Sequence, residues 1–215
     1  MTVDEVTGRI GEIGIIPVVR ARSADEANRA VEAILAGGIP IIEITMTVPN
    51  AVAVIQQVVK KYGSKVLTGA GTVLTSTQAK ACFDAGAEFL VSPGLSVPVL
   101  STARAMKKLA IPGILTPTEL MSASADGATI VKVFPCGNVG GPKYLKSLKG
   151  PFPDMRVIPT GGVNAGNAAE YLKAGAFALG VGADLVDAAA LRAGNVEKVI
   201  AAAKELVQAV RLGRG

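Results

Sequence analysis

A lysine lies in the middle of an apolar segment of this chain, at position 132 in the run IVKVFPC (130–136). Glu43 has a similar setting in IPIIEITMT. Burial of an unpaired charge is unfavourable, so a buried amine loses its proton more readily than an exposed one. A neutral amine at Lys132 can attack a ketone and form a Schiff base, and a carboxylate at Glu43 can move protons to and from the reacting atoms.

Two structural roles are alternatives to this chemistry. Lys132 and Glu43 could form an ion pair that fills the protein interior, because structural ion pairs also perturb pKa values. The lysine could instead extend its ammonium group to an exposed rim. The residue types alone leave these alternatives open.

Two glycine-containing turns are candidates for binding a phosphate group, in PTGGVNAGN (159–167) and LGVGAD (179–184). Backbone N–H groups at such turns and at helix N-termini bind phosphate. Each turn alone is weak support because glycine also serves ordinary turns. Their places after the last two predicted strands favour a phosphate site. The candidate residues are Thr160, Gly161, Gly162, Gly182 and Ala183.

Eight short apolar runs, rich in Val and Ile, are typical of strands buried on both faces of a parallel sheet. Helical segments such as the Ser-capped stretch 23–38 separate them. This alternation predicts a (β/α)₈ TIM barrel with residues 1–215 as a single domain and a short helix before the first strand. An open doubly wound sheet is the alternative. The runs lie at 15–19, 39–44, 65–71, 88–94, 111–115, 130–134, 156–162 and 178–182.

Polar residues of the strand regions gather where each strand is expected to end. In α/β barrels the C-terminal ends of the strands carry the functional groups. We therefore expect functional residues to gather at these ends, which are, in chain order: Arg20, Glu43 and Thr45, Thr72, Ser92-Pro93, Thr116, Lys132, Thr160-Gly161-Gly162 and Gly180-Val181-Gly182.

Composition excludes several other classes of protein. Half of the 215 residues are hydrophobic and 18% are charged, which indicates a folded chain. The formal net charge is +5, but the cations are scattered, so we expect no nucleic-acid partner. No apolar stretch reaches membrane length and no signal peptide is recognisable, so we expect a cytoplasmic protein. The chain has no histidine and two cysteines, which argues against His-dependent nucleophiles and against a metal site.

The chain contains an ordered series of motifs: IPVVRA, GGIPIIEITMTVPNA, GAGTVL, FLVSPG, PGILTPTEL, IVKVFP, GGPKYLKSLKGPFP and IPTGGVN. With these motifs the sequence resembles the bacterial KDPG and KHG aldolase family over about residues 13–210. The resemblance implies a class I aldolase with a (β/α)₈ fold, a homotrimeric assembly, and neither metal nor other cofactor. Such an enzyme cleaves 2-keto-3-deoxy-6-phosphogluconate (KDPG) to pyruvate and glyceraldehyde 3-phosphate, with 4-hydroxy-2-oxoglutarate (KHG) as a second substrate.

The resemblance also implies roles for individual residues. Lys132 corresponds to the Schiff-base lysine and Glu43 to the proton-transferring residue. Thr72 corresponds to the residue that holds the pyruvate carboxylate, while Pro93 and Phe134 correspond to the walls of the pyruvate pocket. The phosphate end corresponds to Thr160, Gly161 and Gly162, followed by Gly182 and Ala183.

Two positions depart from the family pattern. Many members have an arginine four residues after the catalytic glutamate, where this chain has Thr47, and Arg20 is the expected replacement for that cation. Many members have a serine that touches phosphate at the position of Ala183, so here only backbone donors are expected.

Two further functions remain open from the residues themselves. A phosphosugar isomerase or epimerase on the same barrel would use Glu43 as a base and Lys132 as an electrostatic stabiliser. A non-catalytic barrel that binds a phosphometabolite would keep the fold without the chemistry.

Overall fold

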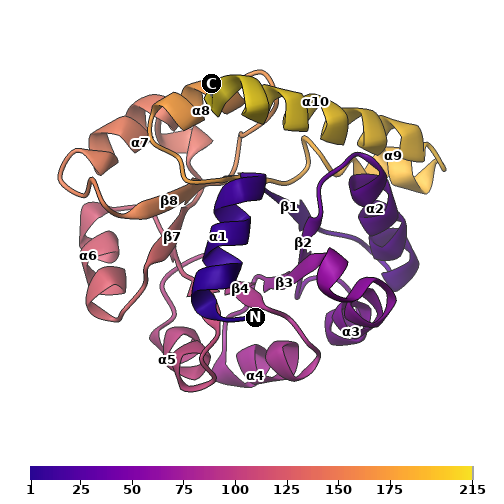
Figure 1. The fold of residues 1–215 in the computed structure, drawn as a ribbon, viewed down its shortest axis with the longest axis horizontal. Helices are drawn as coiled ribbons and strands as arrows, with labels where there is room; N and C mark the ends of the chain where they lie inside the picture. Colours follow the sequence, from indigo (N-terminus) through magenta and orange to yellow (C-terminus); the bar gives the residue numbers. More distant parts are fainter. Residues whose placement is uncertain (215) are drawn as a thin grey trace.

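The computed structural model describes residues 1–214, in which parallel strands alternate with helices along the chain (Figure 1). The strands are β1 (Ile15–Val19), β2 (Ile41–Thr45), β3 (Leu67–Gly71), β4 (Phe89–Val91), β5 (Leu109–Ile111), β6 (Gly113–Ile114), β7 (Ile130–Val133), β8 (Arg156–Pro159) and β9 (Leu179–Val181). The longer helices are α1 (Val3–Ile13), α2 (Ala24–Ala36), α3 (Ala51–Tyr62), α4 (Ser76–Asp84), α5 (Val97–Ala105), α6 (Pro117–Ala125), α7 (Gly141–Lys149) and α10 (Val196–Arg214). The shorter ones are α8 (Ala168–Lys173), α9 (Ala188–Arg192) and the 3-10 helices η1 (Gly63–Lys65) and η2 (Gly137–Val139).

All paired strands run parallel, in two sheets. One sheet has the order β5-β4-β3-β2-β1-β9 and the other has the order β6-β7-β8. The predicted α/β architecture with parallel strands is therefore confirmed. Within residues 1–214 the strands form these two sheets rather than one ring of eight strands. A single parallel bridge between Thr160 and Gly180 connects the end of β8 to β9.

The fifth predicted strand, at 111–115, differs most from the structure. It is replaced by β5 and β6, which lie on either side of Pro112. Proline has no backbone N–H and cannot donate to a ladder, so the strand is interrupted there. The carbonyl of Pro112 still accepts a hydrogen bond of 2.8 Å from the amide of Lys132, and the amide of Gly113 donates to Gly94 at 3.2 Å.

The strands are buried on both faces, as their continuous apolar sequences predict. Every residue of β1, β2, β3 and β7 is buried, including the polar ones. The surrounding core consists of Ile, Val, Leu and Ala with few aromatic residues. Helix α1 begins at a Thr2–Glu5 capping box and buries Val6 and Ile10. It lies in front of the strands in the view of Figure 1.

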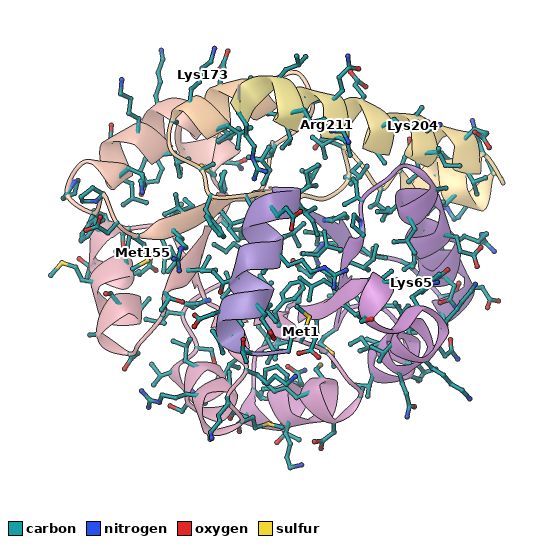
Figure 2. The ribbon with its side chains drawn as sticks, in the orientation of Figure 1. Met1, Lys65, Met155, Lys173, Lys204 and Arg211 are labelled. Carbon is teal, nitrogen blue, oxygen red and sulfur yellow. The ribbon has the colours of Figure 1, made fainter. Side chains whose placement is uncertain are left out.

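Most lysine and arginine side chains lie on the outside of this core, as the labelled ones in Figure 2 show. The labelled cations Lys65, Lys173, Lys204 and Arg211 are exposed and come from three different helical elements. In the part of the chain that the structure describes, no helix has both the length and the apolar character needed to span a bilayer.

Candidate active site

The two candidate catalytic groups are both almost fully buried. Lys132 lies in β7 and is 4% exposed, and Glu43 lies in β2 and is 2% exposed. Burial raises the pKa of the Glu43 carboxyl above its ordinary value, opposed by the positive charges of Lys132 and Arg20. Burial lowers the pKa of the Lys132 amine, opposed by the charge of Glu43 and reinforced by that of Arg20. Desolvation is the largest cause for both groups, so each is driven toward its neutral form.

Arg20 follows directly after β1 and is exposed. Its charge nevertheless acts on both Glu43 and Lys132, so the three side chains belong to one electrostatic cluster. An exposed cation beside two buried titratable groups is accessible to an anionic ligand.

Among residues 1–214, the ion pairs do not include one between Lys132 and Glu43. The Glu43 Oε1 atom is buried without a hydrogen-bond partner in the described chain. The amine instead lies over the ring of Phe134, with 5.0 Å between Nζ and the ring centroid. This arrangement differs from a structural ion pair, in which both groups would be satisfied by each other.

Neighbouring elements bring Phe134 and Pro93 to the same region. Gly113 pairs with Lys132 in the ladder, and a Cβ at Gly113 would lie 2.3 Å from the carbonyl carbon of Pro93. A Cβ at Gly161 would lie 3.5 Å from Cδ2 of Phe134. Both candidate pocket walls, each half-buried, therefore belong to segments packed beside the lysine strand.

Thr72 comes directly after β3 and has a left-handed backbone, with φ of 56°. This conformation is uncommon for a residue other than glycine and often occurs at functional sites. The residue before it, Gly71, lies against Glu43, because a Cβ at Gly71 would be 1.8 Å from Oε1 of that carboxyl group. Thr72 is half-buried at the same strand end.

The candidate phosphate end lies after β8 and β9. Thr160 is buried and bridges to Gly180, and its Oγ1 would lie 2.1 Å from a Cβ placed there. The next two residues after Thr160 are glycines with φ of 89° and 77°, which exposes backbone between the strand and the following helix. Gly182 has open space around it and Ala183 is exposed. Within residues 1–214, no backbone hydrogen bond uses the amides of Gly161, Gly162, Gly182 and Ala183 as donors.

Thr47, at the position of the absent family arginine, is part of a hydroxyl chain. The Thr45 hydroxyl donates to the carbonyl of Val19 at 3.0 Å and lies 2.7 Å from the Thr47 hydroxyl. Because the Thr45 proton is used for Val19, Thr47 donates to Thr45. Its side chain thus supports the ends of β1 and β2, and the cation of this region is Arg20.

Sequence reasoning missed the glycines of β3. Gly69 and Gly71 lie on one face, where a Cβ would meet the ring of Phe89 and the carboxyl group of Glu43 respectively. The signal that could have revealed them is the pair of glycines inside a predicted strand, since glycine there marks a close approach of another group. The sequence alone does not show which side chain lies against each glycine.

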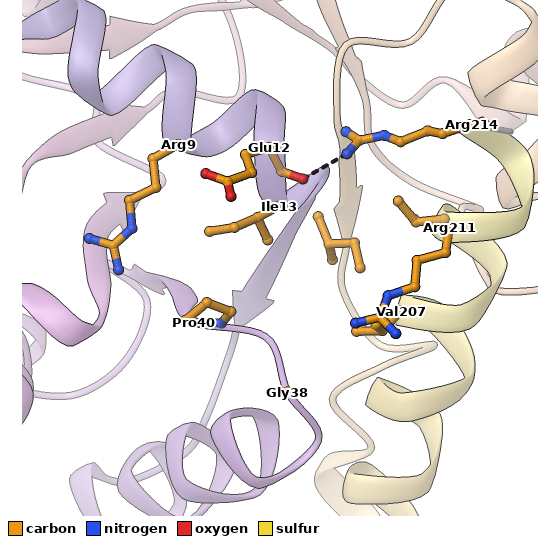
Figure 3. A pocket seen from close by; sticks show the side chains of 10 residues that line it. Arg9, Glu12, Ile13, Gly38, Pro40, Val207, Arg211 and Arg214 are labelled. Carbon is orange, nitrogen blue, oxygen red and sulfur yellow. Dashed lines mark hydrogen bonds between the residues drawn. The ribbon is translucent and has the colours of Figure 1, made fainter.

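A cavity of about 330 Å³ lies at the N-terminal ends of the strands, opposite the ends that carry the candidate site (Figure 3). It is lined by residues that precede β1 and β2, together with arginines of α1 and α10. Arg9 donates to the carbonyls of Ser64 and Lys65, and Arg214 donates to those of Gly11 and Glu12. These two arginines fasten helices to one another, and the cavity is remote from the lysine.

Metal-binding residues do not gather in the described chain. Residues 1–214 contain no group of three or more His, Cys, Asp or Glu side chains arranged to hold a metal ion. Cys82 and Cys136 are buried free thiols. The titratable groups that do gather are therefore an amine and a carboxyl group, which serve proton transfer and covalent catalysis.

Parallel strands that carry a desolvated lysine and a desolvated carboxyl group provide the groups that a Schiff-base enzyme on an α/β fold requires. The family model for KDPG and KHG aldolase matches residues 6–202. The KHG/KDPG aldolase of Escherichia coli (strain K12) is 35% identical over 198 residues, which cover 92% of each chain. The 2-dehydro-3-deoxy-6-phosphogalactonate aldolase of the same strain is 35% identical over 202 residues, covering 93% of this chain and 96% of its own.

A solved structure extends this similarity to the backbone. The KDPG aldolase of Legionella pneumophila, with pyruvate captured as a covalent carbinolamine, has a TM-score of 0.86 and 30% identity. The alignment covers 94% of this chain and 97% of that one. The chain therefore belongs to the KDPG and KHG aldolase family. The predicted resemblance and the prediction of an aldehyde-lyase are confirmed.

Proposed function

We propose that this protein is a class I aldolase in which Lys132 forms a Schiff base with the ketone of a 2-keto-3-deoxy sugar acid. The observation that carries the proposal is a buried amine with a lowered pKa which, among residues 1–214, forms no ion pair with the buried carboxyl group of Glu43. The neutral amine attacks the C2 ketone to give a carbinolamine, which loses water to give an iminium ion. Glu43 supplies the proton that leaves with the water.

Cleavage then uses the iminium ion as an electron sink. The substrate C4 hydroxyl loses its proton to Glu43, the C3–C4 bond breaks, and its electrons form an enamine with the nitrogen as the aldehyde departs. Glu43 returns a proton to C3, and water hydrolyses the resulting pyruvate iminium to free pyruvate and the amine. Every electron moves within the substrate and Lys132, so the cycle needs neither a metal nor another cofactor.

Substrate binding uses groups that surround the lysine. Arg20 and Thr72 hold the carboxylate, with Arg20 in the role that an arginine at position 47 has in many relatives. Phe134 and Pro93 enclose the pyruvate part. Phosphate binds to the backbone donors at the ends of β8 and β9, and the following residues contribute to that end of the site: Thr160, Gly161, Gly162, Gly182 and Ala183.

The substrate that fits this arrangement best is KDPG, which yields pyruvate and glyceraldehyde 3-phosphate, as in the Entner–Doudoroff route. KHG, which yields pyruvate and glyoxylate, is the second substrate. The names of the E. coli KHG/KDPG aldolase and of its phosphogalactonate relative support this class of sugar acid. The methyl group of Ala183 offers no hydroxyl, so phosphate is bound by the main chain.

The proposal extends to the assembly of the molecule. The bridge between Thr160 and Gly180 and the short break at Pro112 support a closed (β/α)₈ barrel that forms a single domain over residues 1–215. A homotrimer is proposed from the family resemblance, and light scattering should give three times the 21.8 kDa chain mass. The two buried free thiols support a reducing, cytoplasmic location.

The test is reduction with borohydride in the presence of pyruvate, followed by mass spectrometry of the peptides. We expect a reduced three-carbon adduct on Lys132 and loss of aldolase activity on trapping. Lys132→Met should give neither adduct nor turnover, whereas Lys146→Met, at an exposed position on α7, should match the wild type. Turnover that survives borohydride would favour an isomerase or epimerase instead. Ligand-dependent stabilisation without released pyruvate would favour a binding protein.

A further inference from the structure

Strand β3 contains two positions without side chains on the face that looks toward the catalytic groups. Side chains alternate along a strand, so Gly69 and Gly71 share one face and Ala70 has the other. A Cβ at Gly71 would lie 1.8 Å from Oε1, 2.6 Å from Cδ and 2.8 Å from Cγ of Glu43. The carboxyl group therefore rests directly on the bare backbone of Gly71.

Position 71 requires glycine because a side chain has no room there, and not because of its backbone conformation. Gly71 is within a regular strand that pairs with β2 through Thr45, and its φ is not in the left-handed region. An alanine could adopt that backbone without strain. The obstacle would be these three atoms of Glu43, which lie closer than the 3.0 Å below which a Cβ essentially never approaches another heavy atom.

Among residues 1–214 the buried Glu43 carboxyl group is held by packing rather than by side-chain hydrogen bonds or an ion pair. Its Oε1 atom has no hydrogen-bond partner among the described residues. The charges of Lys132 and Arg20 act on it, but among residues 1–214 neither side chain forms an ion pair with it. The close contact between the Glu43 carboxyl group and the Gly71 backbone therefore limits how the carboxyl group approaches Lys132 and its adduct.

We infer that Gly71 is a positioning residue for catalysis, which holds Glu43 at the distance from which it exchanges protons with the Schiff-base intermediates. The inference rests on the proposed role of Glu43. It assigns Gly71 no contact with the substrate. Gly71 acts through Glu43, because the absence of a side chain at Gly71 leaves room for the carboxyl group.

The experiment is a double-mutant cycle of Gly71→Ala and Glu43→Ala, measured as kcat, KM for KDPG and Tm. In the wild-type background, Gly71→Ala should lower kcat by about 100-fold, the scale of a displacement of roughly 1 Å in an active site, and change KM much less. It should also lower Tm and shift the pH profile of kcat, because the displaced carboxyl group has new surroundings. In the Glu43→Ala background, the same substitution should change neither kcat nor Tm appreciably, because the colliding atoms are gone.

Gly69→Ala is the matched control. It introduces the same methyl group on the same face of β3, but against Phe89, with 2.3 Å to its Cζ. It should lower Tm without removing the dependence of kcat on Glu43. If Gly71→Ala alone fails to fold, recovery of soluble protein in the Glu43→Ala background would support the contact between Gly71 and the Glu43 carboxyl group.

Two results would overturn the inference. One is an equal loss of kcat and Tm from Gly71→Ala in both backgrounds, which would make Gly71 a structural residue independent of Glu43. The other is an unchanged kcat in Gly71→Ala. A failure of the proposed function is recognised separately, because the wild type would then release no pyruvate from KDPG and give no borohydride adduct on Lys132.

Discussion

Arg20 affects both proposed catalytic groups although it is itself exposed. Its charge lowers the pKa of the Glu43 carboxyl and of the Lys132 amine. A lowered amine pKa increases the fraction of nucleophile at neutral pH, and an exposed guanidinium remains available to a substrate carboxylate. The hydroxyl of Thr47 cannot replace it, because that hydroxyl donates to Thr45.

Replacement of Arg20 by alanine tests these two roles together. We expect Arg20→Ala to weaken pyruvate binding by about 2 kcal/mol, the scale of a lost hydrogen bond to a charged group. We also expect the acid limb of the pH profile to move to higher pH, because the pKa values of both Lys132 and Glu43 rise when the cation is removed. Pyruvate-concentration dependence in the condensation direction measures the first effect. Arg22→Ala, two residues further on, is the control, and an unchanged KM for pyruvate in Arg20→Ala would contradict the proposed carboxylate contact.

The buried amine also has a consequence for stability. Its pKa in the folded protein is below the ordinary value of 10.5, so between these two values the unfolded chain binds a proton that the folded chain lacks. The stability of the wild type therefore rises with pH through this window and is lowest below it. We expect Lys132→Met to raise Tm at neutral pH, by an amount that shrinks toward pH 10.5.

Thermal unfolding of Lys132→Met and wild type over a pH series checks this expectation. Lys146→Met removes an exposed lysine and should show no such pH-dependent difference. A difference in Tm between Lys132→Met and wild type that stays constant with pH would mean that the amine stays protonated in the fold. Methionine is the suitable replacement because its volume resembles that of the lysine stem.

At the scale of elements, the close approach of β6 to the segment after β4 brings the lysine strand to its place. A Cβ at Gly113 would lie 2.3 Å from both the carbonyl carbon and oxygen of Pro93 and 2.6 Å from the amide nitrogen of Gly94. These are backbone atoms, which cannot move aside as a flexible side chain can. Gly113 pairs in turn with Lys132.

We expect Gly113→Ala to lower the free energy of unfolding by about 1–3 kcal/mol or more, the cost of overpacking, and to reduce activity. Gly8→Ala is the opposite case. Gly8 is an exposed residue inside α1 with nothing within 4 Å of the place that a Cβ would occupy, so alanine there should stabilise the protein by up to about 1 kcal/mol. Denaturant unfolding of both variants measures the contrast, and equal effects of the two substitutions would contradict the crowding at Gly113.

The elements were predictable where a local pattern determines them. The apolar runs located β1, β2 and β3 to within two residues of their observed starts, because burial on both faces leaves a continuous hydrophobic sequence. Lys132 and Glu43 stood out for the same reason, as charges in segments built for burial. Two features were not predictable: the contact between Glu43 and Gly71, and the interruption of the strand at Pro112. Both depend on which strands become neighbours and on the distances between those strands.

At the scale of the whole molecule, the N-terminal and C-terminal ends of the strands differ in the groups that they carry. The N-terminal end is closed by α1 and fastened by Arg9 and Arg214, whose donors are used by backbone carbonyls. The C-terminal end carries the buried amine and the unused amide donors. This separation places the structural arginines away from the proposed site, where Arg20 is the cation that we propose binds the substrate carboxylate.

The net charge of +5 acts on the proposed substrate from a distance, because KDPG carries a carboxylate and a phosphate. At low ionic strength the positive field should raise the rate of productive encounter, and salt should remove this effect as the screening length falls to about 10 Å at 0.1 M. We expect kcat/KM for KDPG to fall with added salt while kcat stays constant. Lys204→Glu, which reverses an exposed charge on α10, should lower kcat/KM slightly at low salt and become equal to wild type at high salt. A salt-independent kcat/KM in the wild type would show that the approach of the substrate does not depend on the overall field and that only the cations at the strand ends matter.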